Sequence, residues 1–124
     1  MLVVYKKSYE KITMGLLSFV PDLKDIQRLN DEMEWYEREE NRHLYLWTSE
    51  ETNDFIGVIG VEVGGEMVLL RHIAINPSYR NEGISFDILN ALEETYPDKK
   101  IISTLETGQI VSKWEIEKNN KEQL

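Results

Sequence analysis

The sequence predicts a single α+β domain in three layers, with helices on both sides of a mixed, mainly antiparallel central sheet. Two observations support this fold class. Segments with apolar residues at every third or fourth position alternate with segments where they recur at every second position, in the order β-α-α-β-β-β-α-β-α. A Gly64-Gly65 pair between two apolar runs indicates an antiparallel hairpin in the middle of the chain.

Length and composition allow one folded unit. A chain of 124 residues is long enough for one core and too short for two. Its hydrophobic fraction of 41% is too high for a disordered protein. We expect one domain over residues 1–118, followed by a frayed polar C-terminal tail over residues 119–124.

Several functional classes are excluded by residue types that are rare or absent. The chain has no cysteine, which excludes disulfides, thiolate zinc sites and a cysteine nucleophile. Its two histidines have no suitably spaced carboxylates, so no metal site is predicted. The apolar start is too short for a signal peptide and no run approaches a membrane span, so a cytoplasmic protein without a membrane partner is the simplest interpretation.

The net charge of the chain limits which binding partners are expected. Fourteen basic residues against 23 acidic ones give a net charge of −9. Phosphates would be repelled over most of such a surface, so we expect no nucleic-acid partner. The charge permits a cationic substrate, although solubility alone would also explain it.

The N-terminal third predicts a short strand and two helices. Residues 1–5 are rich in β-formers, and residues 8–19 have helical spacing behind Ser8, a candidate N-cap. Pro21 ends this helix, and Asp22 is the candidate cap of the next one. The apolar stripes are Tyr9, Ile12, Leu16 and Phe19 on the first helix, and Ile26, Leu29, Met33 and Tyr36 on the second.

The middle of the chain predicts three strands. Residues 43–48 alternate as a half-buried strand would, and residues 55–63 and 66–75 form the two arms of the hairpin. The favoured two-residue turn needs positive φ at both central positions, which two glycines allow. Without a bulge, this turn places Glu62 opposite Met67 and Gly57 opposite His72.

The last third predicts a helix, a strand and a final amphipathic segment. The helix covers residues 84–96 with Ser85, Leu89, Leu92 and Tyr96 along one stripe and Ile88 beside it, and Pro97 stops it. Residues 99–104 form a strand, and residues 108–118 carry Ile110, Val111 and Trp114 on an apolar face.

The turn before residue 84 has the features of an anion site. The first N–H groups of a helix have no partner within the helix and point along the positive end of its dipole. Gly83 lets an anion approach the backbone, and Arg80 can add a charged contact. The alternative is that Gly83 is only a turn residue and Arg80 only a surface charge.

The same segment resembles the acetyl-CoA-binding region of the GCN5-related N-acetyltransferase (GNAT) superfamily. The residues that carry the resemblance are Ile73, Ala74, Ile75 and Pro77 at the strand end, and Arg80, Gly83, Ile84 and Ser85 in the loop. The stretches "YKKSYEKITMGLLSF" and "RHIAINPSYRNEGI" further resemble the RibT group, small GNAT-like proteins encoded alongside riboflavin synthesis.

The resemblance implies a cleft that binds acetyl-CoA as cosubstrate. The pantetheine arm would pair with the backbone of Ile73, Ala74 and Ile75 as an added strand does. The pyrophosphate would lie on the backbone amides of Asn81, Glu82, Gly83, Ile84 and Ser85. The Glu82 carboxylate would weaken this binding by roughly 1 kcal/mol if it is exposed.

The customary catalytic residues of the superfamily are absent. Leu69 stands where a strand glutamate is usual, and residues 107–118 offer Ser112 and Trp114 but no tyrosine. His72 is the best substitute base, because its unperturbed pKa of about 6.5 lies near working pH. Packing is the alternative for His72, as it is for Trp114 and for a possible aromatic wall of His43, Tyr45 and Trp47. Glu62 could act through water.

Two functions therefore stand. The first is an acetyl-CoA-dependent N-acetyltransferase that acts on an unidentified small-molecule or protein amine, with a possible link to riboflavin metabolism. The second is a catalytically silent acyl-CoA-binding or protein-interaction module. The chain looks C-terminally truncated relative to the superfamily, and a homodimer would cover the sheet edge that this leaves open.

Overall fold

The computed structural model describes residues 1–79 and 82–122. Within them the strands are β1 (Leu2–Val4), β2 (Arg42–Thr48), β3 (Phe55–Val63), β4 (Met67–Ile75) and β5 (Lys100–Ser103). The helices are α1 (Glu10–Leu17), α2 (Ile26–Arg38), α3 (Glu82–Thr95) and α4 (Gly108–Glu122). Short 3₁₀ turns, η1 (Lys7–Tyr9), η2 (Pro21–Leu23) and η3 (Pro77–Tyr79), precede α1, α2 and α3. The predicted order of strands and helices is confirmed.

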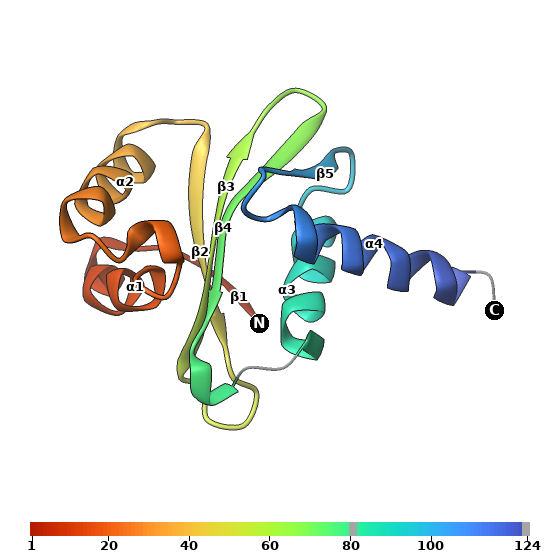
Figure 1. Cartoon of the computed structure of the whole chain (residues 1–124), viewed down its shortest axis with the longest axis horizontal. Coiled ribbons are helices and arrows are strands. Elements are labelled where there is room, and N and C mark those ends of the chain that lie inside the picture. Colours follow the sequence, from red (N-terminus) through yellow and green to blue (C-terminus); the bar gives the residue numbers. More distant parts are fainter. Residues whose placement is uncertain (80–81, 123–124) are drawn as a thin grey trace.

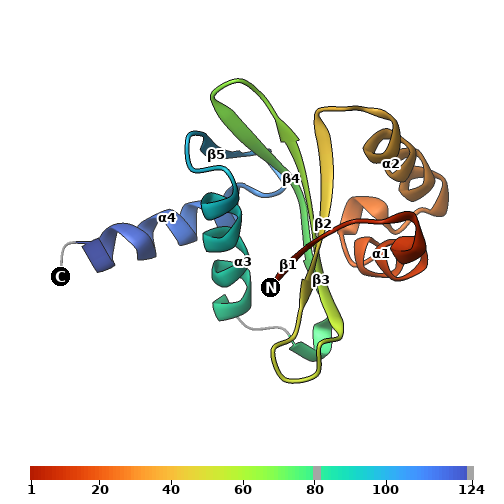
Figure 2. The same ribbon diagram turned by 180° about the vertical axis from the view of Figure 1, so that it is seen from behind.

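The strands form one sheet in the order β1-β2-β3-β4-β5. Neighbouring strands are antiparallel except β4 and β5, which pair in parallel. Helices α1 and α2 cover one face of the sheet, and α3 and α4 lie on the other, as seen in Figure 1 and from behind in Figure 2. The predicted three-layer α+β domain with a mixed, mainly antiparallel sheet is confirmed.

Strand β2 is buried on both faces, so the prediction of a half-buried strand is wrong. Leu44 and Leu46 pack into the hydrophobic cluster beneath α1 and α2, whereas Tyr45 packs into the cluster on the α3 and α4 side. All three residues are at most 9% exposed. Because helices cover both faces of the sheet, the alternation along β2 separates two cores rather than core from solvent.

Helix α2 begins later than its predicted cap. Pro21 starts the turn η2, and Asp25 rather than Asp22 is the N-cap. The Asp25 carboxylate accepts a hydrogen bond from the backbone N–H of Gln27 at 2.9 Å. The predicted stripe of Leu29, Met33 and Tyr36 is buried, while Ile26 is exposed.

The buried face of α1 also differs from the prediction. Thr13, Leu16 and Leu17 are its buried residues, and Ile12 is 43% exposed. Ser8 lies within η1, and the N-terminus of α1 has no side-chain cap. Of the predicted stripe within α1, Leu16 is buried as expected, whereas Thr13 and not Ile12 faces inward one turn before it.

The connection between β3 and β4 is longer than the predicted two-residue turn. Val63 pairs with Val68, and the N–H of Gly64 donates to the carbonyl of Met67 at 2.8 Å. Among the described residues no glycine has a positive φ, so the Gly64-Gly65 pair does not form the turn that was predicted from it. Glycine allows that turn but does not require it.

The register of the hairpin is therefore shifted, and β4 carries a bulge. Glu62 pairs with Leu69 instead of Met67, and Gly57 with Ile75 instead of His72. Gly60 pairs with His72 and Val61 with Leu70, which leaves Arg71 without a partner on β3. A bulge of this kind bends its strand and increases the local twist.

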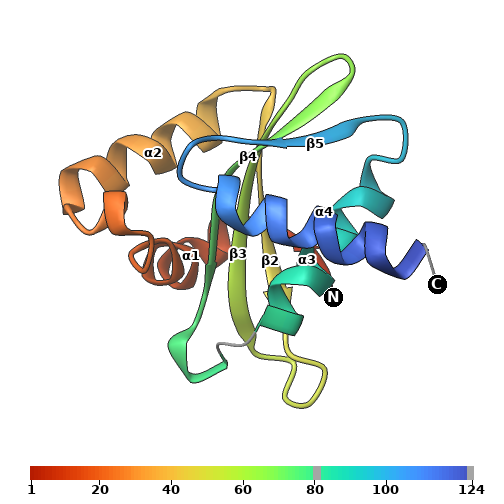
Figure 3. The same ribbon diagram turned by 45° about the vertical axis from the view of Figure 1, so that its right-hand side comes forward.

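The bulge coincides with the point where β5 stops pairing. Strand β5 pairs with β4 only over Met67–Leu70. Figure 3 shows β5 crossing beside the β3–β4 hairpin end of the sheet. From Arg71 to Ile75, β4 has no strand partner on its β5 side within the described chain.

Helix α4 is longer than predicted and is fixed against α3. It continues to Glu122, four residues into the stretch that was expected to be a frayed tail. Trp114 is only 4% exposed, and its indole N–H donates to the side-chain oxygen of Asn90 at 2.9 Å. The prediction that Trp114 is a core residue is confirmed.

Candidate functional site

A cleft of about 610 Å³ opens where β4 and β5 separate. It passes through the sheet layer, because its lining comes from both sides of β4. The lining residues are 19–22 between α1 and η2, 71–75 of β4, Ser85 of α3, and Glu106, Thr107 and Ile110 at the start of α4. Five of the predicted site residues thus line this one cleft: His72, Ile73, Ala74, Ile75 and Ser85.

The backbone of β4 offers unused hydrogen-bonding groups along this cleft. The N–H of Asn76 donates to the carbonyl of Ile56 on the β3 side at 2.7 Å. Because the direction of hydrogen bonding alternates along a strand, Ala74 also faces β3 while Ile73 and Ile75 face the open edge. Two of the three predicted strand residues therefore have backbone groups available to a ligand.

The first turn of α3 lies at the other end of the cleft. Gly83, Ile84 and Ser85 are in this turn, which begins at Glu82 rather than at residue 84. Arg80 and Asn81, which were also predicted to contact the cofactor, lie outside the described residues. This turn is a helix N-terminus, the feature on which the predicted anion site depends.

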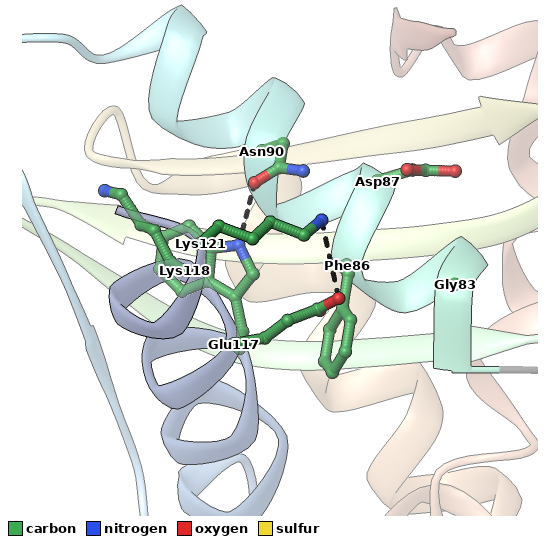
Figure 4. A pocket seen from close by; sticks show the side chains of 8 residues that line it. Gly83, Phe86, Asp87, Asn90, Glu117, Lys118 and Lys121 are labelled. Carbon is green, nitrogen blue, oxygen red and sulfur yellow. Dashed lines mark hydrogen bonds and ion pairs between the residues drawn. The ribbon is translucent and has the colours of Figure 1, made fainter. Parts of the chain in front are cut away.

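A second groove of about 360 Å³ lies between α3 and α4 beside the same turn. Gly83 and Phe86 line it from α3, and Lys118 and Lys121 from α4. Figure 4 shows Lys121 reaching across the groove, with its ammonium group 3.4 Å from the Glu117 carboxylate. Asp87 and Glu117 also line this groove, and Lys118 pairs with Glu93, so the two lysines stand among carboxylates. Sequence reasoning missed these lysines, because they lie in the segment interpreted as the end of a helix and a tail.

His72 lies in the cleft with one ring nitrogen engaged. Its Nδ1 is 2.7 Å from the hydroxyl of Tyr36, a buried residue of α2. Burial, followed by the charges of Arg71 and Arg42, lowers the pKa of His72 to about 4. The imidazole is therefore neutral at pH 7, and its weak basicity does not favour the predicted role of general base.

Two carboxylates at the cleft were not predicted as site residues. Asp22 comes from η2 and Glu106 from the turn between β5 and α4. The charges of both raise the pKa of His72 against the larger effects that lower it. The backbone N–H of Glu106 itself, and then the Thr104 hydroxyl, lower the pKa of the Glu106 carboxyl. Nothing in the sequence indicated that Asp22 and Glu106 lie at the same cleft, because they are far apart in the chain.

The other residues considered as candidates are engaged elsewhere. Glu62 does not line the cleft, and its carboxylate accepts a hydrogen bond from Arg42 Nε at 3.1 Å. Tyr45 and Trp47 pack in the cluster on the α3 and α4 side, whereas His43 is exposed, so these three do not form an aromatic wall.

Residues 1–79 and 82–122 contain neither a metal-binding cluster nor a membrane-spanning helix. In this part of the chain His, Asp and Glu side chains do not gather in groups of three that could hold a metal ion. Every helix in it is too short or too polar to span a bilayer.

Comparisons with known proteins find similarity to acetyltransferases. A model of the Acetyltransferase (GNAT) family matches residues 14–112. An uncharacterized N-acetyltransferase in the lysA 3' region of Bacillus methanolicus is 49% identical over 117 residues, covering 94% of this chain and 96% of that protein.

Solved structures share the fold at low sequence identity. The aminoglycoside N-acetyltransferase AAC(6')-Iy in complex with CoA matches with a TM-score of 0.68 and 15% identity, covering 91% of this chain and 82% of that one. The aminoglycoside 6'-N-acetyltransferase AAC(6')-Ih from Acinetobacter baumannii matches with a TM-score of 0.64 and 16% identity, covering 84% and 78%.

Proposed function

Because the chain belongs to the Acetyltransferase (GNAT) family, whose members use acetyl-CoA as cosubstrate, we propose that it transfers the acetyl group of acetyl-CoA to an amine nitrogen. In this reaction the neutral amine attacks the thioester carbonyl, so that a C–N bond forms and the C–S bond breaks. One proton leaves the nitrogen and the thiolate takes up one proton, which gives an amide and CoA.

The observation that carries the proposal is the open edge of β4 beside the cleft. The amide groups of a pantetheine arm can pair with the exposed backbone of Ile73 and Ile75 as an added strand would. Such pairing would extend the sheet where β5 no longer pairs with β4, and this geometry suits an extended acyl-thioester ligand better than a compact one. Ala74 would contribute clearance rather than hydrogen bonds.

The nucleotide end of the cofactor would lie beyond the first turn of α3. The backbone amides of Gly83 and Ser85 in that turn are suited to a pyrophosphate. The adjoining groove carries Lys118 and Lys121, which could bind a further phosphate if they exchange their ion pairs with Glu93 and Glu117 for it. The contributions of Arg80 and Asn81 stay predictions.

Two carboxylates at the cleft can serve as the proton acceptor. The carboxylates of Asp22 and Glu106 line the cleft and can take up a proton from the attacking nitrogen through water. His72 stays a candidate from the sequence, and with a pKa of about 4 it is about as weak a base as an ordinary carboxylate, so basicity alone does not rank it below Glu106, whose pKa is also lowered.

One observation favours a second function, a catalytically silent acyl-CoA-binding module. Leu69 occupies the position of the customary strand glutamate, and α4 contains no tyrosine. Such a module would bind the cofactor in the same cleft without turnover.

Two measurements separate these functions. Acetyl-CoA and CoA should raise the midpoint of thermal unfolding, because a ligand that binds only the folded state stabilises it. Thiol release with a panel of amines then distinguishes an enzyme, which releases CoA in proportion to amide formed, from a silent binder. No midpoint shift with either ligand would contradict both functions.

A link to riboflavin synthesis and a homodimer are two further predictions from the sequence. The link to riboflavin synthesis is tested by including amines of that pathway in the panel. A homodimer is tested by light scattering across micromolar concentrations, where a constant monomer mass would contradict it.

A further inference from the structure

The bulge in β4 places two consecutive nitrogen-bearing side chains on the same wall of the cleft. Arg71 Nη1 lies 3.8 Å from Glu62 Oε1, and His72 Nδ1 lies 2.7 Å from the hydroxyl of Tyr36. Both partners belong to the face of the sheet that α2 covers. In a regular strand neighbouring side chains point to opposite faces, so this pairing depends on the bulge.

The hydrogen bond from Tyr36 fixes the tautomer of His72. Burial, the largest effect, raises the pKa of Tyr36, so its hydroxyl keeps its proton. Within the described residues that hydroxyl makes one hydrogen bond, to Nδ1 of His72. If Nδ1 carried the proton, the buried O–H of Tyr36 would have no acceptor. Tyr36 therefore donates, Nδ1 accepts, and the proton of the neutral ring is on Nε2.

The guanidinium of Arg71 has N–H donors that make no hydrogen bond within the described residues. Its Nε is buried and has no hydrogen-bond partner among the described residues. Its distance to Glu62 is that of an ion pair and is too long for a hydrogen bond. Since Arg71 lines the cleft, the N–H groups of its two terminal nitrogens that do not face Glu62 can meet a ligand there.

Other segments that line the same cleft, apart from β4, carry acidic side chains. Asp22 lies on η2 and Glu106 on the turn before α4, and both act electrostatically on His72. The wall formed by Arg71 and His72 is thus rich in N–H donors, while the neighbouring segments carry negative charge. A purely cationic amine would use only the acids and leave the donor wall unpaired.

We propose that Arg71 and His72 together bind a carboxylate of the acceptor, and that its amino group lies toward Asp22 and Glu106. The acceptor class is then an amine that carries a carboxylate, as an amino acid does. A carboxylate has two oxygens, and the Arg71 guanidinium and His72 Nε2–H supply donors to both. This inference rests on the proposed acetyl transfer for its chemistry, but the binding site can be tested without turnover.

The test compares amines that differ only by the carboxylate. Suitable pairs are γ-aminobutyrate with propylamine, ornithine with putrescine, and phenylalanine with phenethylamine. Each is titrated into protein saturated with CoA, with the thermal midpoint as readout, and each is assayed for thiol release with acetyl-CoA. We expect the carboxylate-bearing member of at least one pair to bind at least tenfold more tightly and to have the larger kcat/KM.

Variants then assign the preference to the two residues. Arg71→Gln should raise KM for the amino acid at least tenfold and change KM for the matched amine less than threefold. His72→Gln keeps an N–H donor and should retain more affinity than His72→Leu. Arg28→Gln removes a charge from the exposed surface of α2 and serves as the matched control with no change.

The outcomes separate this inference from the proposed function. Binding of the amino acid without thiol release would contradict acetyl transfer to that class and support the carboxylate site. Thiol release with equal preference for both members of every pair would overturn the site and leave acetyl transfer standing. Equal losses for both members in Arg71→Gln, or binding of neither member of any pair, would also overturn it.

Discussion

The hydroxyl of Thr107 donates a hydrogen bond to the backbone carbonyl of Leu70, 2.8 Å away, at the last residue of β4 that pairs with β5. Thr107 is only 4% exposed, and its oxygen also accepts a hydrogen bond from the backbone N–H of Thr104 at 3.0 Å. One side chain thus joins the turn after β5 to the point where the two strands separate. The mouth of the cleft depends on this contact.

Thr107→Val should lower the free energy of unfolding by about 1–3 kcal/mol, because it leaves the Leu70 carbonyl buried without its donor. Urea denaturation gives this value directly. Thr95→Val is the matched control, since the Thr95 hydroxyl bonds only to its own exposed helix turn at Ala91, and we expect a change below about 0.5 kcal/mol. Equal effects of the two substitutions would contradict the role given to Thr107.

Gly60→Ala should displace Tyr36 and break its hydrogen bond to His72. A Cβ at Gly60 would lie 2.0 Å from the Tyr36 hydroxyl oxygen and 2.5 Å from its Cζ. We expect a loss of about 1–3 kcal/mol of stability from this overpacking, together with a change in the nitrogen-15 shifts of the His72 ring.

Gly15→Ala is the control for that substitution. A Cβ at Gly15 meets nothing within 4 Å and lies on the exposed side of α1. This variant should gain about 0.5–1 kcal/mol from helix propensity and leave the His72 signals unchanged. A His72 spectrum that is unaltered in Gly60→Ala would show that the hydrogen bond survives.

The stability of the fold should rise with pH between about 4 and 6.5. The pKa of His72 is about 4 in the folded chain, while its ordinary value is 6.5. In this window the unfolded chain binds more protons, so protonation favours unfolding as the pH falls. The effect should reach at most about 3 kcal/mol, and it should be absent above pH 7. Denaturation of the protein and of His72→Gln across this range checks it, because the variant should lose that part of the slope.

Lys121→Glu should weaken CoA binding if the groove between α3 and α4 holds the nucleotide end. Reversal of one exposed charge should raise Kd by about 3- to 10-fold at low salt, and added salt should reduce the difference. Calorimetric titration with CoA measures it. Lys11→Glu makes the same charge change on α1, far from the groove, and should leave Kd unaltered. Equal weakening by both variants would indicate a general effect of net charge.

The sequence by itself determined the order of the elements, the fold class and the strand segment that lines the cleft. These follow from local patterns, such as the stripe of Leu29, Met33 and Tyr36 on α2 and the strand end at Ile73 and Ile75. Periodicity reports which side chains leave water, and helix-start signals lie within a few residues of one another, so both can be read along the chain.

Only the tertiary structure decided the register of β4 and the chemistry of the cleft. A one-residue bulge at Arg71 has no clear local signal, yet it turns Arg71 and His72 to the same face. The partner of His72 is Tyr36, 36 residues earlier in the chain, and its burial changes the predicted base into a neutral hydrogen-bond donor. Packing sets the solvation and the neighbours of each ionisable group, and these fix its protonation.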